Sequence, residues 1–206
     1  MQPAPQTPRA ELDPGPRVYR SATGTRLPSV TEILRECRLE DFSYVDAGVL
    51  EAAREFGSNV HHACHLHDTG ELDWTALDPA LVPYLEAWRA FLEDTGAVVI
   101  ASEQAVVHER LGYAGTPDRV LAWGSRVVIP DLKATAALPR TVGVQTAAYA
   151  KAYQAMRGGK EPERYCIHLK PGVRGRNYKA HPRRDPAEWS LFLSCLNVYK
   201  FRNPHA

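Results

Sequence analysis

The chain reads Gly112-Tyr-Ala-Gly-Thr-Pro-Asp118-Arg-Val in one predicted strand and Val128-Ile-Pro-Asp131-Leu-Lys133 in the next. Side chains two positions apart share one face of a strand, so Asp131 and Lys133 project to the same side. If Asp118 lies on the neighbouring strand of a tight hairpin, two carboxylates and an ammonium group converge. Two carboxylates suit a hard divalent cation such as Mg²⁺ or Mn²⁺, and a nearby lysine can stabilise charge on a phosphate.

The alternative interpretation of these residues is a set of ordinary ion pairs on the surface of a hairpin. However, the apolar run 127–129 precedes Asp131 and indicates a central strand, where a charge needs a partner or a metal. Glu103, on the preceding predicted strand, is a further candidate acidic ligand or base. The charged cluster is therefore the first candidate for a functional site.

Signals on both sides of this hairpin predict an α/β chain with the element order α-β-β-β-α-β. Ser29 and Glu32 form a capping-box pattern, and Gly124-Ser125 is typical of a two-residue hairpin turn. The predicted helices cover residues 29–37, 46–68, 79–96, 142–156 and 186–201, and the predicted strands cover residues 17–20, 97–109, 113–123, 126–134, 164–170 and 177–180. We expect a disordered Pro-rich tail over 1–16 and one domain over 17–206, with a helical part at about 29–96 and a core at about 97–170.

Two predicted helices carry polar residues that can face the hairpin. The helix over 46–68 has apolar residues at spacings of three and four, which predicts one inward face: Val49, Ala53, Phe56, Val60 and Cys64. His61 lies beside this stripe, whereas His62 should point to solvent. Gln145 and Tyr149 are four apart and are neighbours on one face of the Ala-rich helix. Taken alone, a hydrogen-bonded core histidine and a polar helix edge are the simpler explanations.

The composition is that of an ordinary globular chain, with 206 residues and 44% hydrophobic residues, which excludes a disordered, collagen-like or membrane-embedded protein. The net charge of +1 hides an asymmetry: residues 36–94 contain 13 acidic and 3 basic side chains, and residues 119–184 contain 14 basic and 3 acidic ones. Such asymmetry indicates a nucleic-acid surface on the basic side, although a solvated hairpin with scattered charges is an alternative. The candidate DNA contacts are Arg119, Lys170, Arg174, Arg176 and Lys179.

Processing and compartment signals are few. Residues 1–16 contain no apolar signal-peptide core, and no apolar run approaches the ~20 residues of a membrane-spanning helix. The four cysteines are far apart in the sequence, which is typical of reduced intracellular thiols. We therefore expect a soluble, cytoplasmic protein of a bacterium or a phage-infected host, without a membrane partner.

The order of these features resembles that of the PD-(D/E)XK nuclease superfamily and, within it, the RecB-like exonuclease branch with its small stand-alone, phage-type nucleases. The resemblance covers about residues 28–170 and rests on the ordered set Gly57-Ser-Asn-Val-His61, Glu103, the Asp118 stretch, Asp131-Leu-Lys133 and Gln145-x-x-x-Tyr149. It implies a restriction-endonuclease-like core (αβββαβ), in which a central mixed sheet is flanked by helices.

The resemblance also implies roles for these residues. Asp118, Asp131 and His61 would bind Mg²⁺ or Mn²⁺, and Lys133 would be the catalytic lysine. Glu103 corresponds to a further acidic catalytic position of the family. Gln145 and Tyr149 correspond to a motif that supports the active site and contacts DNA.

Two features depart from the family pattern. Pro130 stands where the family usually has an aliphatic residue, and because proline lacks a ladder donor it predicts a strand end or a bulge. Relatives with an iron–sulfur cluster have three cysteines close together near the carboxyl terminus, whereas Cys195 stands alone there, so no cluster is expected.

Three hypotheses follow. The leading one is a metal-dependent DNA exonuclease that processes DNA ends in recombination, repair or phage DNA metabolism. The second is a DNA-binding, recombination-accessory module with weak or no catalysis, which Pro130 would favour. The third is a helical zinc site formed by His61, Cys64, His65 and Asp68. A recombinase or helicase partner and a homo-oligomer stay open.

Overall fold

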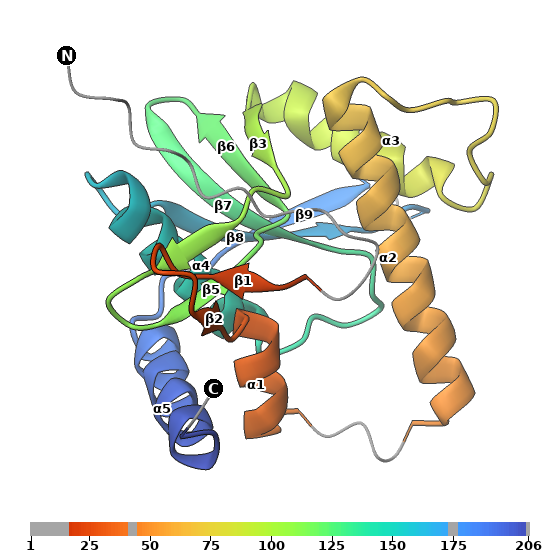
Figure 1. Cartoon of the computed structure of the whole chain (residues 1–206). Coiled ribbons are helices and arrows are strands. Elements are labelled where there is room, and N and C mark those ends of the chain that lie inside the picture. Colours follow the sequence, from red (N-terminus) through yellow and green to blue (C-terminus); the bar gives the residue numbers. More distant parts are fainter. Residues whose placement is uncertain (1–16, 41–44, 173–176, 205–206) are drawn as a thin grey trace.

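A mixed sheet of five strands forms the centre of the protein, in the order β3-β6-β7-β8-β9 (Figure 1). The computed structural model describes residues 17–40, 45–172 and 177–204. The strands are β3 (Val98–Ser102), β6 (Arg119–Trp123), β7 (Arg126–Lys133), β8 (Glu163–Leu169) and β9 (Tyr178–Pro182). The pair β7 and β8 is parallel, and helix α4 (Val142–Arg157) makes the crossover that a parallel pair requires. The predicted α/β class and mixed sheet are confirmed and are consistent with a restriction-endonuclease-like core.

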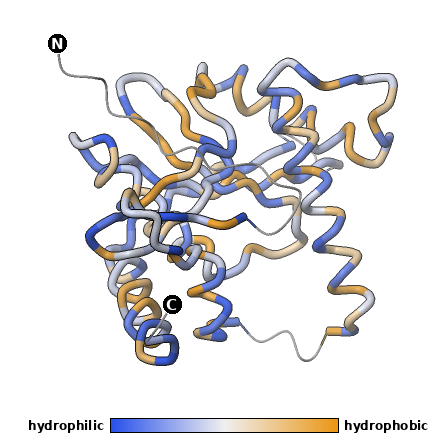
Figure 2. Tube along the Cα trace, in the orientation of Figure 1, coloured by the Kyte–Doolittle hydropathy of each residue, from blue (hydrophilic) through white to orange (hydrophobic). Residues whose placement is uncertain are grey.

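Helices cover both faces of this sheet. On one face α4 packs against β7 and β8, and α1 (Val30–Cys37) and α5 (Ala187–Arg202) pack against α4. On the other face lie α3 (Val82–Thr95) and the second half of α2 (Ala47–Thr69). Figure 2 shows hydrophobic stretches along the central strands, between these helical layers. None of the described helices is long and apolar enough to cross a membrane.

Local sequence signals set several element boundaries as predicted. Ser29 caps α1, because its Oγ accepts the Glu32 amide at 3.0 Å and the Glu32 carboxylate accepts the Ser29 amide at 3.4 Å. Gly124 has a φ of 61° in the two-residue turn between β6 and β7. Gly158 ends α4. The expected Pro-rich tail, residues 1–16, lies outside the described residues.

The two long strands predicted over 97–109 and 113–123 are each divided. Their outer parts form a separate two-stranded sheet, β4 (Val106–His108) with β5 (Tyr113–Gly115), beside the central sheet. The division follows from a register shift between Val99 and Ala101 and from Glu103, whose φ of 51° breaks the extended backbone. The predicted strand at 17–20 is reduced to β1 (Tyr19–Arg20), which pairs with β2 (Arg26–Leu27). A turn held by Asp78 occupies the predicted first residues of α3.

The predicted inward face of α2 is buried only in the second half of the helix. Val60 and Cys64 are buried, whereas Ala53 is exposed and Val49 has 62% of its surface exposed. The reason is tertiary, since the contacts of α2 with β3 and α3 lie at its second half and the first half extends away from the sheet (Figure 1). The periodicity therefore identified the inward-facing side of α2 correctly but predicted burial along more of the helix than the structure shows.

Candidate active site

The site lies where β6 and β7 separate. The ladder between them joins Leu121 to Val128 and stops there. Beyond this point the Asp118 Oδ2 atom accepts the Leu132 amide at 2.8 Å, so a carboxylate takes the place of a ladder carbonyl. Pro130 does not end β7, because β7 stays paired with β8 as far as Lys133. Backbone amides two residues apart point to the same side of a strand, so the nitrogen of Pro130 faces β6, as the Leu132 amide does. Because the β6–β7 ladder is open at this point, the N–H group that proline lacks would have had no ladder carbonyl to bond to.

Asp131 and Lys133 project from one face of β7, as predicted. Asp131 is 3% exposed, and its Oδ2 lies 2.7 Å from the Lys133 Nζ atom. Asp131 Oδ2 is buried, and the Lys133 ammonium is the partner that the described structure gives it. A buried carboxylate oxygen that already faces a cation is a candidate for a metal ligand.

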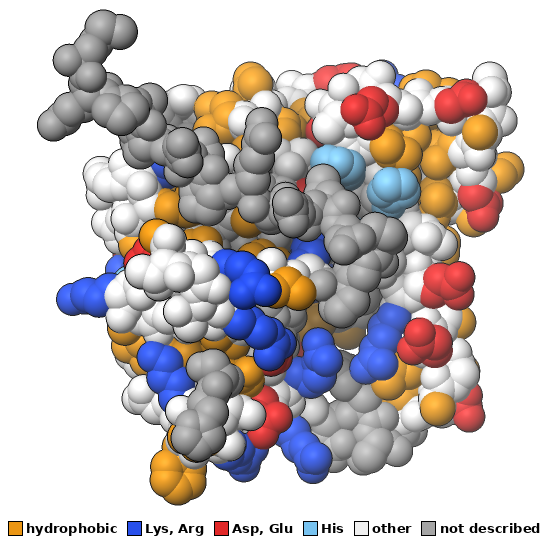
Figure 3. Space-filling view, viewed as in Figure 1, with side chains coloured by type: hydrophobic (Ala, Val, Ile, Leu, Met, Phe, Trp, Pro, Cys, Tyr) orange, Lys and Arg blue, Asp and Glu red, His pale blue; other side chains and the backbone are white. Residues whose placement is uncertain are grey.

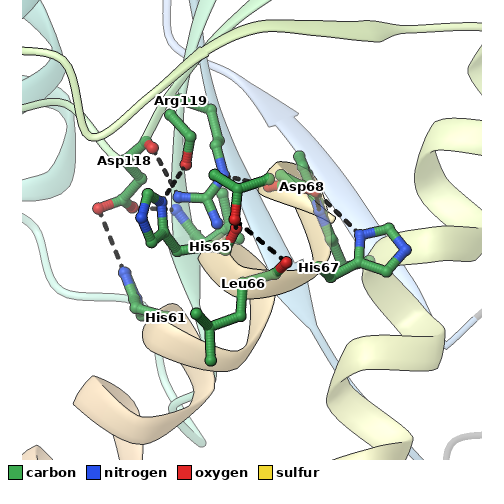
Figure 4. A network of polar contacts seen from close by, with 11 residues as sticks. His61, His65, Leu66, His67, Asp68, Asp118 and Arg119 are labelled. Atoms are coloured by element: carbon green, nitrogen blue, oxygen red, sulfur yellow. Dashed lines mark hydrogen bonds and ion pairs between the residues drawn. The ribbon is translucent and has the colours of Figure 1, made fainter. Parts of the chain in front are cut away.

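His61 reaches the same place from α2. Its Nδ1 lies 3.2 Å from Asp118 Oδ1 (Figure 4). His62 is exposed, as its helical position predicts. The structure thus brings together Asp118, Asp131, Lys133 and His61, which come from β7, α2 and the residue before β6.

Mutual charges set the protonation of this cluster. Burial acts to raise the pKa of Asp118, but His61 and then Lys133 lower it well below its usual range. Burial and the charge of Asp118 raise the pKa of Asp131. Burial acts to lower the pKa values of His61 and Lys133, but the carboxylates raise both of them. His61 and Lys133 therefore offset the charge of two carboxylates that are shielded from water to different degrees, with 21% of the Asp118 side chain and 3% of the Asp131 side chain exposed.

Tyr149 closes the site from α4. It is 5% exposed and accepts a hydrogen bond at 3.1 Å from the Gln145 Nε2 atom, which confirms that the two side chains are neighbours. Burial raises the pKa of Tyr149 above its usual range, and the charges of Asp118 and Asp131 add to the shift. A Cβ atom on Gly115 would lie 2.5 Å from the Tyr149 ring, so the glycine makes room for this tyrosine.

Glu103 stands beside Asp118 through the backbone. Its amide donates to the Asp118 carbonyl at 3.0 Å. Its carboxylate forms an ion pair with Arg17. The structure therefore places Glu103 next to the cluster, with its side chain engaged by a residue near the amino terminus.

Arg119 does not lie where a DNA contact would. Its residue is 1% exposed, and the guanidinium forms an ion pair with Asp68 of α2 (Figure 4). Arg119 Nη1 also donates to the Asp118 carbonyl at 2.6 Å. The prediction for Arg119 is corrected: side-chain burial makes it an interior ion pair that holds the backbone of Asp118. Asp68 was missed in this role, although it lies seven residues after His61 and hence on the same face of α2.

The predicted DNA contacts at the carboxyl-terminal side are partly described. Lys170 follows β8 and Lys179 lies in β9, where it is exposed. Arg174 and Arg176 lie outside the described residues. On the face in Figure 3, acidic side chains gather over α2 and the segment between α2 and α3, and Lys and Arg gather over β1, β2, α1 and α5.

The donor set fits a hard divalent cation, although the ligands are engaged with one another. Within the described part of the chain, no three His, Cys, Asp or Glu side chains converge closely enough to hold a metal. The carboxylate oxygens of Asp118 and Asp131 are nevertheless the donors that Mg²⁺ or Mn²⁺ prefers. The helical zinc site is not assembled, because His65 contacts Ser102, Asp68 contacts Arg119 and Cys64 lies in the core.

Comparisons with known proteins find similarity among solved structures. No protein-family model matches the chain, and no curated protein matches it. Among solved structures, the chain is similar to an alkaline exonuclease from Laribacter hongkongensis, with 14% sequence identity and a TM-score of 0.39. The alignment covers 85% of this chain and 92% of the exonuclease.

Proposed function

We propose that the protein is a divalent-metal-dependent DNA nuclease, most simply an exonuclease that processes DNA ends in recombination, repair or phage DNA metabolism. The observation that carries the proposal is the cluster of Asp118, Asp131, Lys133 and His61 at the opening between β6 and β7. Asp131 is 3% exposed and stands beside a second carboxylate, an electrostatic cost that a bound divalent cation would offset.

Asp118 and Asp131 would hold the cation, with His61 as a further ligand. When bound, Mg²⁺ or Mn²⁺ supplies a Lewis acid that activates water and neutralises charge on a phosphate. The Leu132 amide fixes the Asp118 carboxylate, and the buried Arg119 fixes its carbonyl, so the ligand is held from both ends. The raised pKa of Lys133 keeps the proton on Nζ, where the ammonium can stabilise negative charge on the phosphate under attack.

The test uses purified full-length chain with linear and closed circular DNA, in Mg²⁺, Mn²⁺ or chelator. We expect cleavage of linear DNA that requires the metal and that falls by at least about 10²-fold in Asp131→Asn and Lys133→Ala. Lys160→Ala, which removes an exposed lysine outside the cluster, is the matched control. Circular dichroism checks that each variant is folded.

Each alternative result has a definite meaning. Cleavage that survives both substitutions would refute the proposed site. Cutting of closed circles would replace the exonuclease assignment by an endonuclease one. Salt-sensitive DNA binding with no cleavage under any metal would support the recombination-accessory module instead.

A further inference from the structure

A pocket of about 570 Å³ lies beside the second half of α4, between the β4–β5 turn and α5. In Figure 1, β5, α4 and α5 lie together on one side of the molecule, with α2 on the other. The pocket begins at Lys151, about 9 Å along the helix from Gln145 at 1.5 Å per residue, and no residue of the charged cluster lines it. Its volume is in the range of sites for small organic ligands.

Contacts between the surrounding elements hold the walls of this pocket in place. The Met156 Sδ atom of α4 accepts a hydrogen bond from the Val107 amide of β4 at 3.3 Å. The Lys151 Nζ atom lies 5.9 Å from the centre of the Trp189 ring, so α4 also contacts the start of α5. Together with Leu111, the side chains of Met156 and Trp189 make one side of the pocket apolar.

His108 supplies a buried hydrogen-bond donor to the pocket. It lines the pocket and is 8% exposed. Its Nδ1 atom accepts the Leu111 amide at 3.4 Å, so the proton of the neutral ring lies on Nε2. Among the residues that the structure describes, none accepts a hydrogen bond from this Nε2. A buried donor without a protein acceptor fits a ligand that carries one.

The charges at the pocket favour an anion. Two cations line it, Arg110 and Lys151, against one acid, Glu109, whose carboxylate already accepts a backbone amide of the β1–β2 hairpin at 2.9 Å. Lys151 also pairs with Glu161, whereas Arg110 is exposed and has no ion pair within the described part of the chain. Burial and then the charges of Arg110 and Lys151 lower the pKa of His108, so the ring lies in a positive potential.

We propose that this pocket binds a nucleoside monophosphate. The phosphate is held by the three donors of the pocket, which are His108, Arg110 and Lys151. The sugar and the base lie against the apolar side. The inference goes beyond the proposed function, because the pocket shares no residue with the proposed metal site, and a ligand of this class is what an exonuclease releases.

Isothermal titration of the purified full-length chain with dAMP, in chelator, tests the pocket. Inorganic phosphate and deoxyadenosine are titrated separately, so that the two parts of the nucleotide are compared. Arg110→Ala removes an exposed cation of the pocket, and Lys151→Met keeps the apolar stem beside Trp189. Arg157→Ala is the matched control, because it removes an exposed arginine of α4 that does not line the pocket. Circular dichroism checks that each variant is folded.

We expect Arg110→Ala and Lys151→Met to bind dAMP about 10- to 100-fold more weakly, since each loses a hydrogen bond to a charged group. Deoxyadenosine, which lacks the phosphate, should bind more weakly by a similar factor. Arg157→Ala and Lys133→Ala should bind dAMP as the unmodified chain does.

Three results would overturn the inference. Unchanged affinity in Arg110→Ala would exclude the pocket, and a loss in Lys133→Ala alone would move the nucleotide to the candidate active site. No binding of dAMP by the unmodified chain would refute the pocket and leave the nuclease proposal standing, because metal-dependent cleavage is measured separately.

Discussion

Asp68→Ala tests how the buried side of α2 supports the candidate active site. The Asp68 side chain is 1% exposed and that of Arg119 is 0% exposed. Asp68 also accepts hydrogen bonds from Trp88 Nε1 at 2.9 Å and His67 Nδ1 at 3.0 Å. Since Arg119 Nη2 is already buried without a partner, removal of Asp68 leaves the guanidinium with no counter-charge. Breaking a buried pair in this way costs about 3–5 kcal/mol of the free energy of unfolding.

Urea denaturation followed by tryptophan fluorescence and circular dichroism measures this loss. Glu93→Ala is the matched control, because the Arg89–Glu93 pair is exposed and should contribute less than about 1 kcal/mol. The double variant Asp68→Leu/Arg119→Met removes both charges and should recover most of the stability, since an apolar pair can replace a buried ion pair.

The same change should weaken binding at the proposed metal site. Arg119 donates to the Asp118 carbonyl, so the folded Asp68→Ala protein should bind Mn²⁺ about 10- to 100-fold more weakly. Isothermal titration below the unfolding transition measures this affinity. A loss of stability below about 1 kcal/mol, equal to that of Glu93→Ala, would refute the reasoning that Asp68 compensates a buried charge.

Three further predictions concern the cluster itself. Gly115→Ala should lower the free energy of unfolding by about 1–3 kcal/mol, because the added Cβ would lie 2.5 Å from the Tyr149 ring. Gly57→Ala, whose added Cβ would meet nothing within 4 Å, should instead stabilise α2 by about 0.5–1 kcal/mol, and urea denaturation compares the two variants. Asp118 raises the pKa of His61 against the effect of burial. The free energy of unfolding lost in His61→Asn should therefore be largest below the pKa that His61 has in the unfolded chain, and should shrink as pH rises through its pKa in the folded protein. An equal loss at all pH values would contradict the ion pair. Mn²⁺ at about 100 times its Kd should stabilise the protein by about 2.7 kcal/mol, seen as a rise in Tm that Asp118→Asn abolishes.

Much of the candidate site could be predicted because its spacing is local. Asp131 and Lys133 share a face in any regular strand, and Gln145 and Tyr149 share one in any helix. The two-residue turn at Gly124 was also predictable, and it fixes the β6–β7 register, whose continuation places Asp118 opposite Asp131. The role of Arg119 was not, because a basic residue in a basic half of the chain looks like a surface contact until its burial is known.

The sequence by itself determined the α/β class, the element order and the residues of the charged cluster, since these depend on periodicity, turn chemistry and spacing along the chain. Only the tertiary structure decided the rest: the division of the long strands into two sheets, the opening between β6 and β7, and the pairing of Asp68 with Arg119. These features depend on contacts between segments far apart in the sequence, such as α2 against β6. Burial decides whether a charge faces solvent or another charge, and local spacing does not contain that information.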